Sequence, residues 1–590
     1  MALHQLHDVI RRCQAIPDDG FKAEDYDQFQ MAGRSCLEEG KTAEVLDIVT
    51  DEKNKEIVKS MGWNLLGPLV KIVLKKEAES LQHCLTTLKH VLEVCSPKEL
   101  LVGLLEQIED ADVDNIAETI ILLLQPLQTA LLKLGKKKAS SLGMSLSTVL
   151  NQISQLPVPY TKEQEEEDVY GLCQCCAALI EFVKPFVDEV DRGRESKAIV
   201  AENEQRIELL KFCMKSLGNP VLQSQLDKIP DSAEDPPLRH FAAEILVILS
   251  CIGESFPALL LHHLVKKKAE PGFLEEDVKY PMESLACLSY LLFVQHIGIE
   301  RFPTVFSPVF ILQFNMQYIE VLLKSSEESM LSKGLELYEK SLQRTEDNSL
   351  PMQLLEVKCF LSVPQDLVTV MTLCPIQHLR TEALAVFQLY IDKFDTEGKH
   401  KLFGCLLKIS QHAGVQGYII TNIKNQIDFS LKPGNSNVWF SGPQLLPLLH
   451  LVLSLPEGPE TDLLQNFDRI MGSLNLLRYL LIRDKEWDNH TGIWTELYKI
   501  EENFLKLLHT GLKMSKAHYE AEIKKTKENN RKRGPKESKA VCTLTVGGEK
   551  LSNVTPEMHL QVLQSAMFTF DLIESVLARI EEIIEVKVKP

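Results

Sequence analysis

Apolar residues that recur every three or four positions, in stretches separated by proline- and glycine-containing turns, constrain this chain more than any other feature. The clearest example is residues 441–484, where leucine-rich stripes occupy residues 445–455 and 463–481. This spacing places the apolar side chains on one face of an α-helix. Residues 456–460, Pro-Glu-Gly-Pro-Glu, cannot continue a helix and turn the chain between the two stretches. The segment therefore predicts a helical hairpin.

The predicted hairpin needs neighbours of its own kind. Its apolar stripes cover more surface than one partner helix can bury, which is typical of helical-repeat arrays. Ser441 and Gln444 have the form of a capping box for the first helix, and Thr461 or Asp462 is expected to cap the second. Similar helix-length stretches follow one another along the chain, with about 40 residues for each pair, a period found in HEAT-type repeats.

The chain is therefore predicted to be all-α, a HEAT-like helical-repeat solenoid in two parts, because 590 residues exceed what one hydrophobic core supports. A change from basic to Pro-Gly to acidic composition marks 266–281 as the linker between 1–265 and 282–590. Within residues 524–540, eight Lys or Arg stand against two Glu, which predicts a disordered basic loop. Residues 541–551 are expected to form a small β-hairpin.

The charge of the chain argues against two classes of partner. It has 83 acidic and 64 basic residues, a formal net charge of −19. Nucleic acids and anionic membranes are polyanions, so neither is expected to bind. The polar start lacks the apolar core of a signal peptide, and no apolar run is expected to reach the ~18 residues of a membrane span. Fourteen Cys without such a signal suggest reduced thiols. The predicted location is the cytoplasm, with the nucleus left open.

Four short motifs are candidate binding or catalytic sites, and none of them matches the pattern that such a site requires. Gly40-Lys41-Thr42 resembles the end of a phosphate loop, but Ser35 occupies the position of the first glycine. Cys173 and Cys176 are spaced as metal or redox cysteines, yet no second ligand pair and no preceding strand accompany them. Ser255 lacks the second glycine of a nucleophile elbow, and the histidines form no metal-binding motif. The sequence predicts no catalytic, cofactor or metal site, and it does not favour an enzyme.

Three of the four tryptophans lie in one part of the chain, at Trp439, Trp487 and Trp494. Trp487 and Trp494 flank the polar segment 488–491. Aromatic side chains beside exposed loops are good interface anchors. The alternative is that each one closes the end of a helical hairpin, and the sequence favours neither.

Several helix segments, in order over almost the whole chain, match a known family. They are MGWNLLGP (61–68), LLLQPLQT (122–129), YGLCQCCAALIEFVKPF (170–186), MTLCPI (371–376), LPEGPETDLLQNFDRIM (455–471), SKAHYEAEI (515–523) and FTFDLIESVLARI (568–580). Together they resemble the glomulin family. The basic insert at 531–536 departs from the family pattern, which leaves any family role of that loop open.

The resemblance implies HEAT-like repeats in two parts and a specific partner. Members are expected to bind the RING domain of the RING-box subunit of cullin–RING ubiquitin ligases, together with its cullin. The C-terminal repeats would cover the surface where the ubiquitin-conjugating E2 enzyme docks, and ubiquitination would be inhibited. Association with FK506-binding immunophilins is also implied. Apart from these partners the chain is expected to be a monomer without a cofactor.

Location in the C-terminal repeats and side-chain type suggest which residues bind this partner. The predicted partner-binding residues are Trp487, Asn489, Trp494, Lys516, His518, Tyr519 and Glu520. One alternative function is an acidic helical-repeat transport adaptor, although no Trp here has Asn four residues on, as armadillo-type carriers have. A scaffold for an immunophilin, kinase, phosphatase or chaperone is another.

Overall fold

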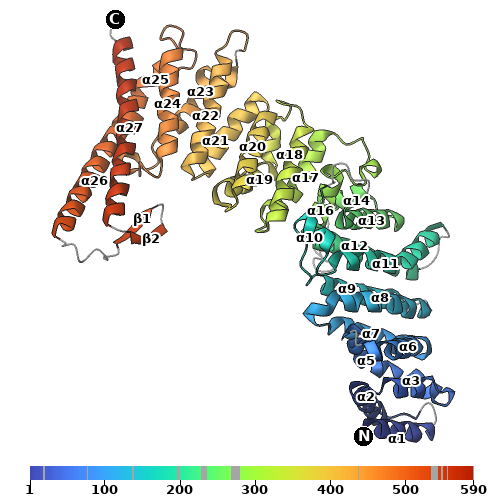
Figure 1. Cartoon of the computed structure of the whole chain (residues 1–590). Helices are drawn as coiled ribbons and strands as arrows, with labels where there is room; N and C mark the ends of the chain where they lie inside the picture. The colour runs from blue at the N-terminus through green and yellow to red at the C-terminus, as the bar shows by residue number, and fades with distance from the viewer. Residues whose placement is uncertain are drawn as a thin grey trace. The chain divides into compact units, whose positions relative to one another are not determined.

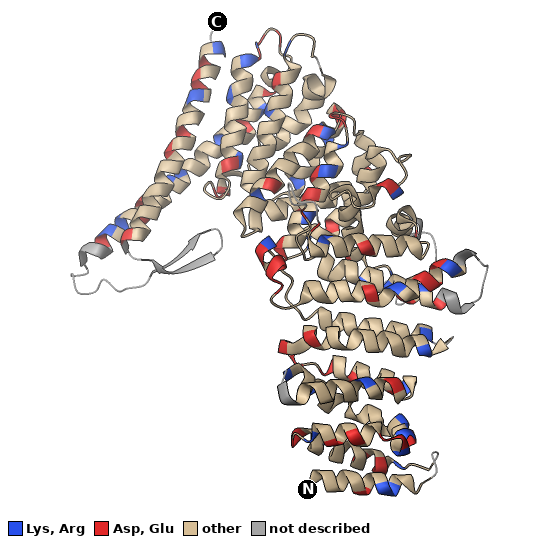
Figure 2. Cartoon of the chain, turned by 45° about the vertical axis from the view of Figure 1, so that its right-hand side comes forward, with Lys and Arg blue, Asp and Glu red and all other residues tan. Residues whose placement is uncertain are grey.

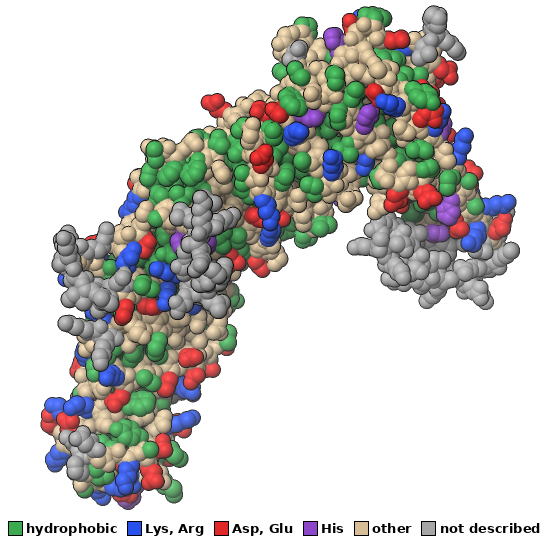
Figure 3. All heavy atoms as spheres, turned by 180° about the vertical axis from the view of Figure 1, so that it is seen from behind, with side chains coloured by type: hydrophobic (Ala, Val, Ile, Leu, Met, Phe, Trp, Pro, Cys, Tyr) green, Lys and Arg blue, Asp and Glu red, His purple; other side chains and the backbone are tan. Residues whose placement is uncertain are grey.

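The computed structural model describes residues 1–16, 20–75, 78–135, 138–195, 200–227, 235–266, 279–435, 437–532, 542–546, 549–554 and 556–588. This part of the chain is a succession of antiparallel helices, which agrees with the predicted all-α repeat architecture (Figure 1). It also contains two short strands. Charged residues of the N-terminal helices lie largely toward the helix ends (Figure 2). On the face drawn in Figure 3, acidic and basic side chains are interspersed.

The helices form two compact units, Met1–Ser341 and Leu342–Pro590. The boundary falls inside α18 (Glu328–Gln343), which differs from the linker expected at 266–281. Most of that segment lies outside the described residues. Helices on either side of it are joined, since the Tyr318 hydroxyl donates to the carbonyl of Leu260 at 2.5 Å. Such contacts place both sides of the expected linker in the first unit.

The first unit contains these α-helices, in chain order: α1 (Ala2–Gln14), α2 (Ala23–Glu38), α3 (Thr42–Thr50), α4 (Lys55–Met61), α5 (Leu66–Lys75), α6 (Ala78–Val94), α7 (Pro97–Glu109), α8 (Ile116–Lys133), α9 (Lys138–Ile153), α10 (Lys162–Glu167), α11 (Leu172–Glu195), α12 (Val200–Ser216), α13 (Pro237–Cys251), α14 (Phe256–Lys266), α16 (Met282–Phe293), α17 (Pro308–Leu323) and most of α18.

The second unit contains α19 (Cys359–Leu373), α20 (Gln377–Lys393), α21 (Thr396–Ile409), α22 (Ala413–Ser430), α23 (Gly442–Val452), α24 (Phe467–Arg483), α25 (Ile493–Ile500), α26 (Lys506–Lys532) and α27 (Pro556–Val588). The short helices that matter below are η1 (Glu52–Asn54), η2 (Gly62–Leu65), η3 (Val113–Asn115) and η9 (Gly458–Glu460).

The predicted hairpin at 441–484 is present as α23 and α24, but its caps differ from the expectation. The Ser441 hydroxyl donates to the carbonyl of Asn437 at 2.5 Å, so it does not cap α23. Asp462 accepts from the backbone of Leu464 and Gln465 at 3.0 Å in a turn that precedes α24. Because this turn uses the capping side chain first, α24 begins only at Phe467.

Side chains of α24 close the hairpin by pairing with the exposed carbonyl ends of α23. Arg469 donates to the carbonyls of Leu451 and Ser454 at 3.3 Å, and Ser473 donates to the carbonyl of Val452 at 2.9 Å. The last carbonyls of a helix have no partner within the helix. Arg469 and Ser473 therefore pair with carbonyls at the end of α23 and just after it.

The region near the C-terminus departs from the expected loop. Residues 524–532, predicted to be disordered, form the end of α26. Lys, Glu and Arg favour helices, which explains why this charged stretch continues the helix, and residues 533–541 lie outside the described part. Strand β1 (Cys542–Val546) pairs antiparallel with β2 (Glu549–Val554), with Val546 opposite Glu549. The connecting residues 547–548 are not among those described.

Two helical segments are more apolar than the sequence pattern suggested. Glu52–Lys75 and Val113–Lys133 each contain an 18-residue window with mean hydropathy 1.3, long and apolar enough to cross a membrane. In the array, 50% and 44% of these windows are buried. The first is also divided among η1, α4, η2 and α5. Both segments pack against neighbouring helices, α5 against α6 and α8 against α7 and α11.

The chemical motifs considered above have structural roles. Gly40 has φ +76° and ends α2, where the backbone N–H of Lys41 reaches back to the carbonyl of Cys36 at 2.9 Å; this is the helix stop expected of a glycine. Cys173 and Cys176 lie buried on α11. Burial raises the pKa of their neighbour Cys175 to about 12, so its thiolate is disfavoured at neutral pH.

Candidate partner-binding surface

The seven residues predicted to bind a partner lie in two separate places in the second unit. The first group lies in the connection between α24 and α25 and at the start of α25, and comprises Trp487, Asn489 and Trp494. The second group lies on α26 and comprises Lys516, His518, Tyr519 and Glu520. The arrangement of these helices is visible in Figure 1.

The connection between α24 and α25 is organised around the buried carboxylate of Asp484, which is 2% exposed. Its two oxygens accept from the backbone N–H of His490 at 3.0 Å and of Thr491 at 2.8 Å. The Thr491 hydroxyl donates to the same carboxylate at 2.5 Å. Hydrogen bonds to an ionised acceptor are stronger than neutral ones. Asp484 therefore ties the end of the loop, at His490 and Thr491, to the end of α24.

Asn489 completes this loop. It has φ +40°, a left-handed conformation that Asn adopts more readily than most residues. Its side-chain oxygen accepts from the backbone N–H of Trp494 at 3.2 Å, and its amide nitrogen donates to the Thr495 hydroxyl at 2.8 Å. Both ends of the Asn489 amide are therefore used at the start of α25, a role that the sequence did not reveal.

Trp494 joins the loop to two helices. Its indole nitrogen donates to the carbonyl of Asp484 at 3.0 Å. The ammonium of Lys587, near the end of α27, lies 5.2 Å from the centre of the indole ring and donates to the carbonyl of Leu481 at 2.5 Å. The half-buried Trp494 thus closes the end of a hairpin, as one of the two interpretations proposed.

Trp487 has the opposite character. Its side chain is 78% exposed, and the ammonium of Lys485 lies 5.1 Å from its ring. Two more exposed apolar side chains, Ile482 and Val586, lie on the helix ends that Lys587 joins. We call Ile482, Lys485, Trp487 and Val586 the α24-end surface. It presents an exposed aromatic side chain on a fixed loop, which suits an interface anchor.

The α26 group is partly engaged within the chain. Lys516 donates to Asp571 at 2.6 Å and to Glu574 at 2.5 Å, both on α27. Burial alone would lower the pKa of Lys516, but the two carboxylates outweigh it and raise the pKa. Tyr519 packs edge-on against Phe570, with ring centres 5.2 Å apart. Within this group, His518 and Glu520 are exposed.

The two groups do not form one cluster. Lys516 contacts α27 at Glu574, whereas Trp494 contacts it at Lys587. The rise of 1.5 Å per residue separates these two points by roughly 20 Å along the helix. A single partner would have to extend along α27 to touch both groups.

The sequence predicts that the last helix, α27, contributes to the contact, but it does not single out two exposed apolar residues there. Phe568 is 71% exposed and Leu572 is 53% exposed, one helical turn apart. The opposite face carries the buried stripe, including Phe570, Ile573 and Leu577. The sequence does show that these two apolar residues lie outside the buried stripe of the helix. Exposed apolar residues of this kind are often found at interaction sites.

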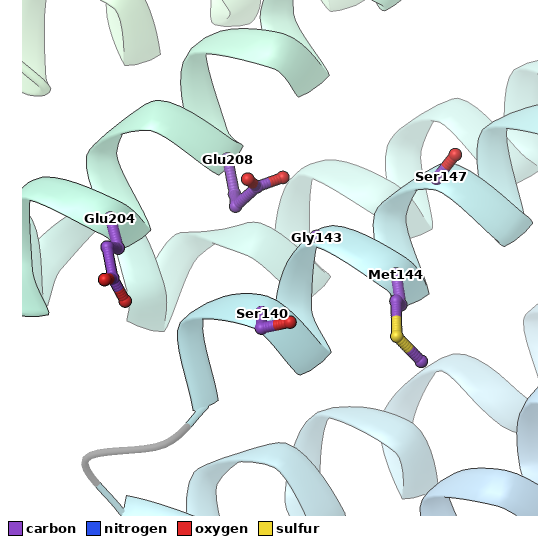
Figure 4. A pocket seen from close by; sticks show the side chains of 6 residues that line it. All are labelled: Ser140, Gly143, Met144, Ser147, Glu204 and Glu208. Carbon is purple, nitrogen blue, oxygen red and sulfur yellow. The ribbon is translucent and has the colours of Figure 1, made fainter.

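A shallow pocket of about 520 Å³ lies in the first unit between α9 and α12 (Figure 4). It is lined by Ser140, Gly143, Met144, Ser147, Glu204 and Glu208. Glu208 pairs with Lys211 at 2.8 Å, and the lining includes neither His nor Cys. Among the described residues, no group of three His, Cys, Asp or Glu side chains could hold a metal ion.

Close packing beneath the α26 group gives a testable prediction about Gly511. A Cβ atom at this position would lie 2.9 Å from the carbonyl oxygen of Pro459 in η9. Gly511→Ala is therefore expected to separate α26 from η9 and to cost about 1–2 kcal/mol. The matched control is Gly404→Ala in α21, where a Cβ meets nothing within 4 Å and stability is expected to rise by roughly 0.5–1 kcal/mol. Thermal melting measures the stability of both variants. Equal shifts of the melting temperature in the two variants would contradict close packing between α26 and η9.

Comparison with known proteins identifies a family to which this chain is similar and two relatives that it resembles along its whole length. The profile of a family described as "Uncharacterised protein family, YAP/Alf4/glomulin" matches residues 1–566. The chain is 56% identical to glomulin from Homo sapiens over 594 aligned residues and 55% identical to glomulin from Mus musculus over 593. Each alignment covers all of this chain and 98% of the relative. A solved engineered protein aligns with 85% of this chain and 100% of its own length at 11% identity, and the TM-score of 0.24 is too low to indicate a shared fold.

Proposed function

The chain belongs to the YAP/Alf4/glomulin family, and on that premise we propose that it is a non-enzymatic inhibitor of cullin–RING ubiquitin ligases. It binds the RING domain of the RING-box subunit through its C-terminal repeats and occupies the surface where the ubiquitin-conjugating enzyme docks. The inhibition takes place in the cytoplasm and needs neither a cofactor nor a metal.

The observation that carries this proposal is the exposed Trp487 on a loop held by Asp484. A rigid aromatic anchor loses little conformational entropy on binding. Trp is also among the residues that most often dominate the binding energy of an interface. The α24-end surface therefore provides a central anchor without any rearrangement of the chain.

Inhibition by occlusion requires only that the chain bind the RING domain tightly, and it needs no catalytic step. A specific interface buries roughly 800 Å² on each partner, enough to cover one face of a small domain. Lys516 and Tyr519 contribute indirectly, by holding α26 against α27. Phe568 and Leu572 extend the exposed apolar area along α27, so one partner can use both the loop and this helix.

A competition experiment tests the proposed docking surface. The chain is titrated by calorimetry into a purified RING-box–cullin complex, alone and with saturating conjugating enzyme. Mutually exclusive binding predicts an apparent affinity that weakens in proportion to the enzyme concentration. An affinity that stays the same at every enzyme concentration would place the chain elsewhere on the ligase.

A further inference from the structure

A groove of about 640 Å³ crosses the N-terminal repeats, far along the chain from the α24-end surface. Its floor is α5, and its walls come from α2, the turn after α7 and the start of α8. We call it the N-terminal groove. Nothing in the proposed function uses it.

Part of the N-terminal groove is apolar and open. Met31 on α2 is 70% exposed, and Pro68, Ile72 and Leu74 on α5 are half-buried along the floor. Removing a side chain as large and apolar as Met31 from water is favourable, so a ligand that covers it binds more tightly. Met also adapts its shape to different partners.

Three carboxamides line the same groove, Gln30, Gln107 and Asn115. Within the described chain, none of the three side chains has a hydrogen-bond partner. Gly67 makes room for Gln107, because a Cβ at Gly67 would lie only 3.0 Å from the side-chain oxygen of Gln107. A carboxamide offers one acceptor and a donor group, as a peptide bond does. These side chains can therefore pair with the backbone of an extended peptide.

The charges of the N-terminal groove are divided between its two sides. Lys71 and Lys75 are exposed one turn apart on α5 and form no ion pair with any described carboxylate. Arg34, by contrast, is paired with Glu38 at 2.7 Å. On the other side, Asp110 and Asp112 are also exposed without a described basic partner. Two unpaired lysines are notable in a chain with a net charge of −19.

We infer that the N-terminal groove binds an extended peptide segment of a partner protein that carries two carboxylates separated by one residue. Side chains one turn apart on a helix lie roughly 6 Å apart, and alternate side chains of an extended peptide lie about 6.6 Å apart. The two carboxylates therefore pair with Lys71 and Lys75. An apolar residue next to them packs on Met31, and a basic residue faces Asp110 and Asp112.

A displayed library of random 16-residue peptides, selected on the full-length protein, tests this inference. The enriched peptides are expected to share two acidic residues at alternate positions, followed by a Lys or Arg. A synthetic peptide with the enriched sequence is then titrated by fluorescence anisotropy. Lys71→Glu combined with Lys75→Glu should weaken its binding at least tenfold.

The matched control reverses Lys55 and Lys59, which lie one turn apart on α4 and do not line the groove. Lys55→Glu with Lys59→Glu makes the same change in net charge and should alter the affinity less than twofold. The groove assignment is wrong if no peptide is enriched, if the enriched peptides lack carboxylates, or if both double variants lose affinity equally. RING binding should be unchanged in the groove variant, so failure of either proposal leaves the other intact.

Discussion

Replacing Asp484 by alanine is expected to lower the stability of the loop at 485–491 by about 3 kcal/mol, because two backbone N–H groups and a hydroxyl lose a buried, charged acceptor. His490 and Thr491 would be left with unsatisfied donors. Unfolding of a repeat array need not be two-state, so local opening is the appropriate measurement. Amide hydrogen exchange at these two residues should accelerate roughly a hundredfold, since 1.4 kcal/mol corresponds to tenfold.

Asp488 provides the control for this variant. It lies in the same loop, is exposed, and accepts no hydrogen bond from a described side chain or backbone group. Asp488→Ala should therefore change stability by less than about 0.5 kcal/mol. Asp484→Asn keeps the shape and one good acceptor, and its effect should fall between the two. Equal exchange rates in the Asp484 and Asp488 variants would mean that the carboxylate does not organise the loop.

Replacing Trp487 by alanine is expected to weaken binding of the RING-box–cullin complex about 30-fold, or roughly 2 kcal/mol, the loss typical of a central aromatic anchor. The fold should be unaffected, because the side chain is 78% exposed and packs on little of its own chain. Calorimetric titration gives the affinity, and thermal melting verifies that the variant is folded.

The control for Trp487 is Tyr170→Ala, which removes an aromatic side chain that is 59% exposed in the first unit. Its binding should match that of the unaltered chain. If Trp487→Ala binds within twofold of the unaltered protein, the α24-end surface is not the docking site. The exposed pair Phe568 and Leu572 would then be the next candidate.

The helical hairpins were predictable because local apolar periodicity determines them. The stripes at 445–455 and 463–481 became α23 and α24, since burial of an apolar face stabilises a helix wherever neighbours are available. The start of α24 was not predictable from a capping residue alone. Asp462 can cap a helix or stabilise a turn with the same oxygen, and in the structure this oxygen accepts from the turn residues Leu464 and Gln465.

The candidate site was predictable in position but not in detail. Its aromatic residues stood out by type, and the resemblance to the glomulin family placed them in the C-terminal repeats. Trp494 is held by the carbonyl of Asp484, which accepts from its indole, and by Lys587, which lies 93 positions beyond it in the sequence. Such long-range contacts leave no local pattern. For the same reason the sequence could not show that Asn489 and Lys516 are engaged within the chain.

Ubiquitin-chain synthesis by a purified cullin–RING complex, with this protein titrated in, tests the central proposal most directly. Occlusion of the RING surface predicts inhibition that is complete near one-to-one stoichiometry with the ligase and that excess conjugating enzyme relieves. The Trp487→Ala variant should require a proportionally higher concentration. Undiminished chain synthesis at a large excess of the protein would contradict the proposal that it inhibits these ligases.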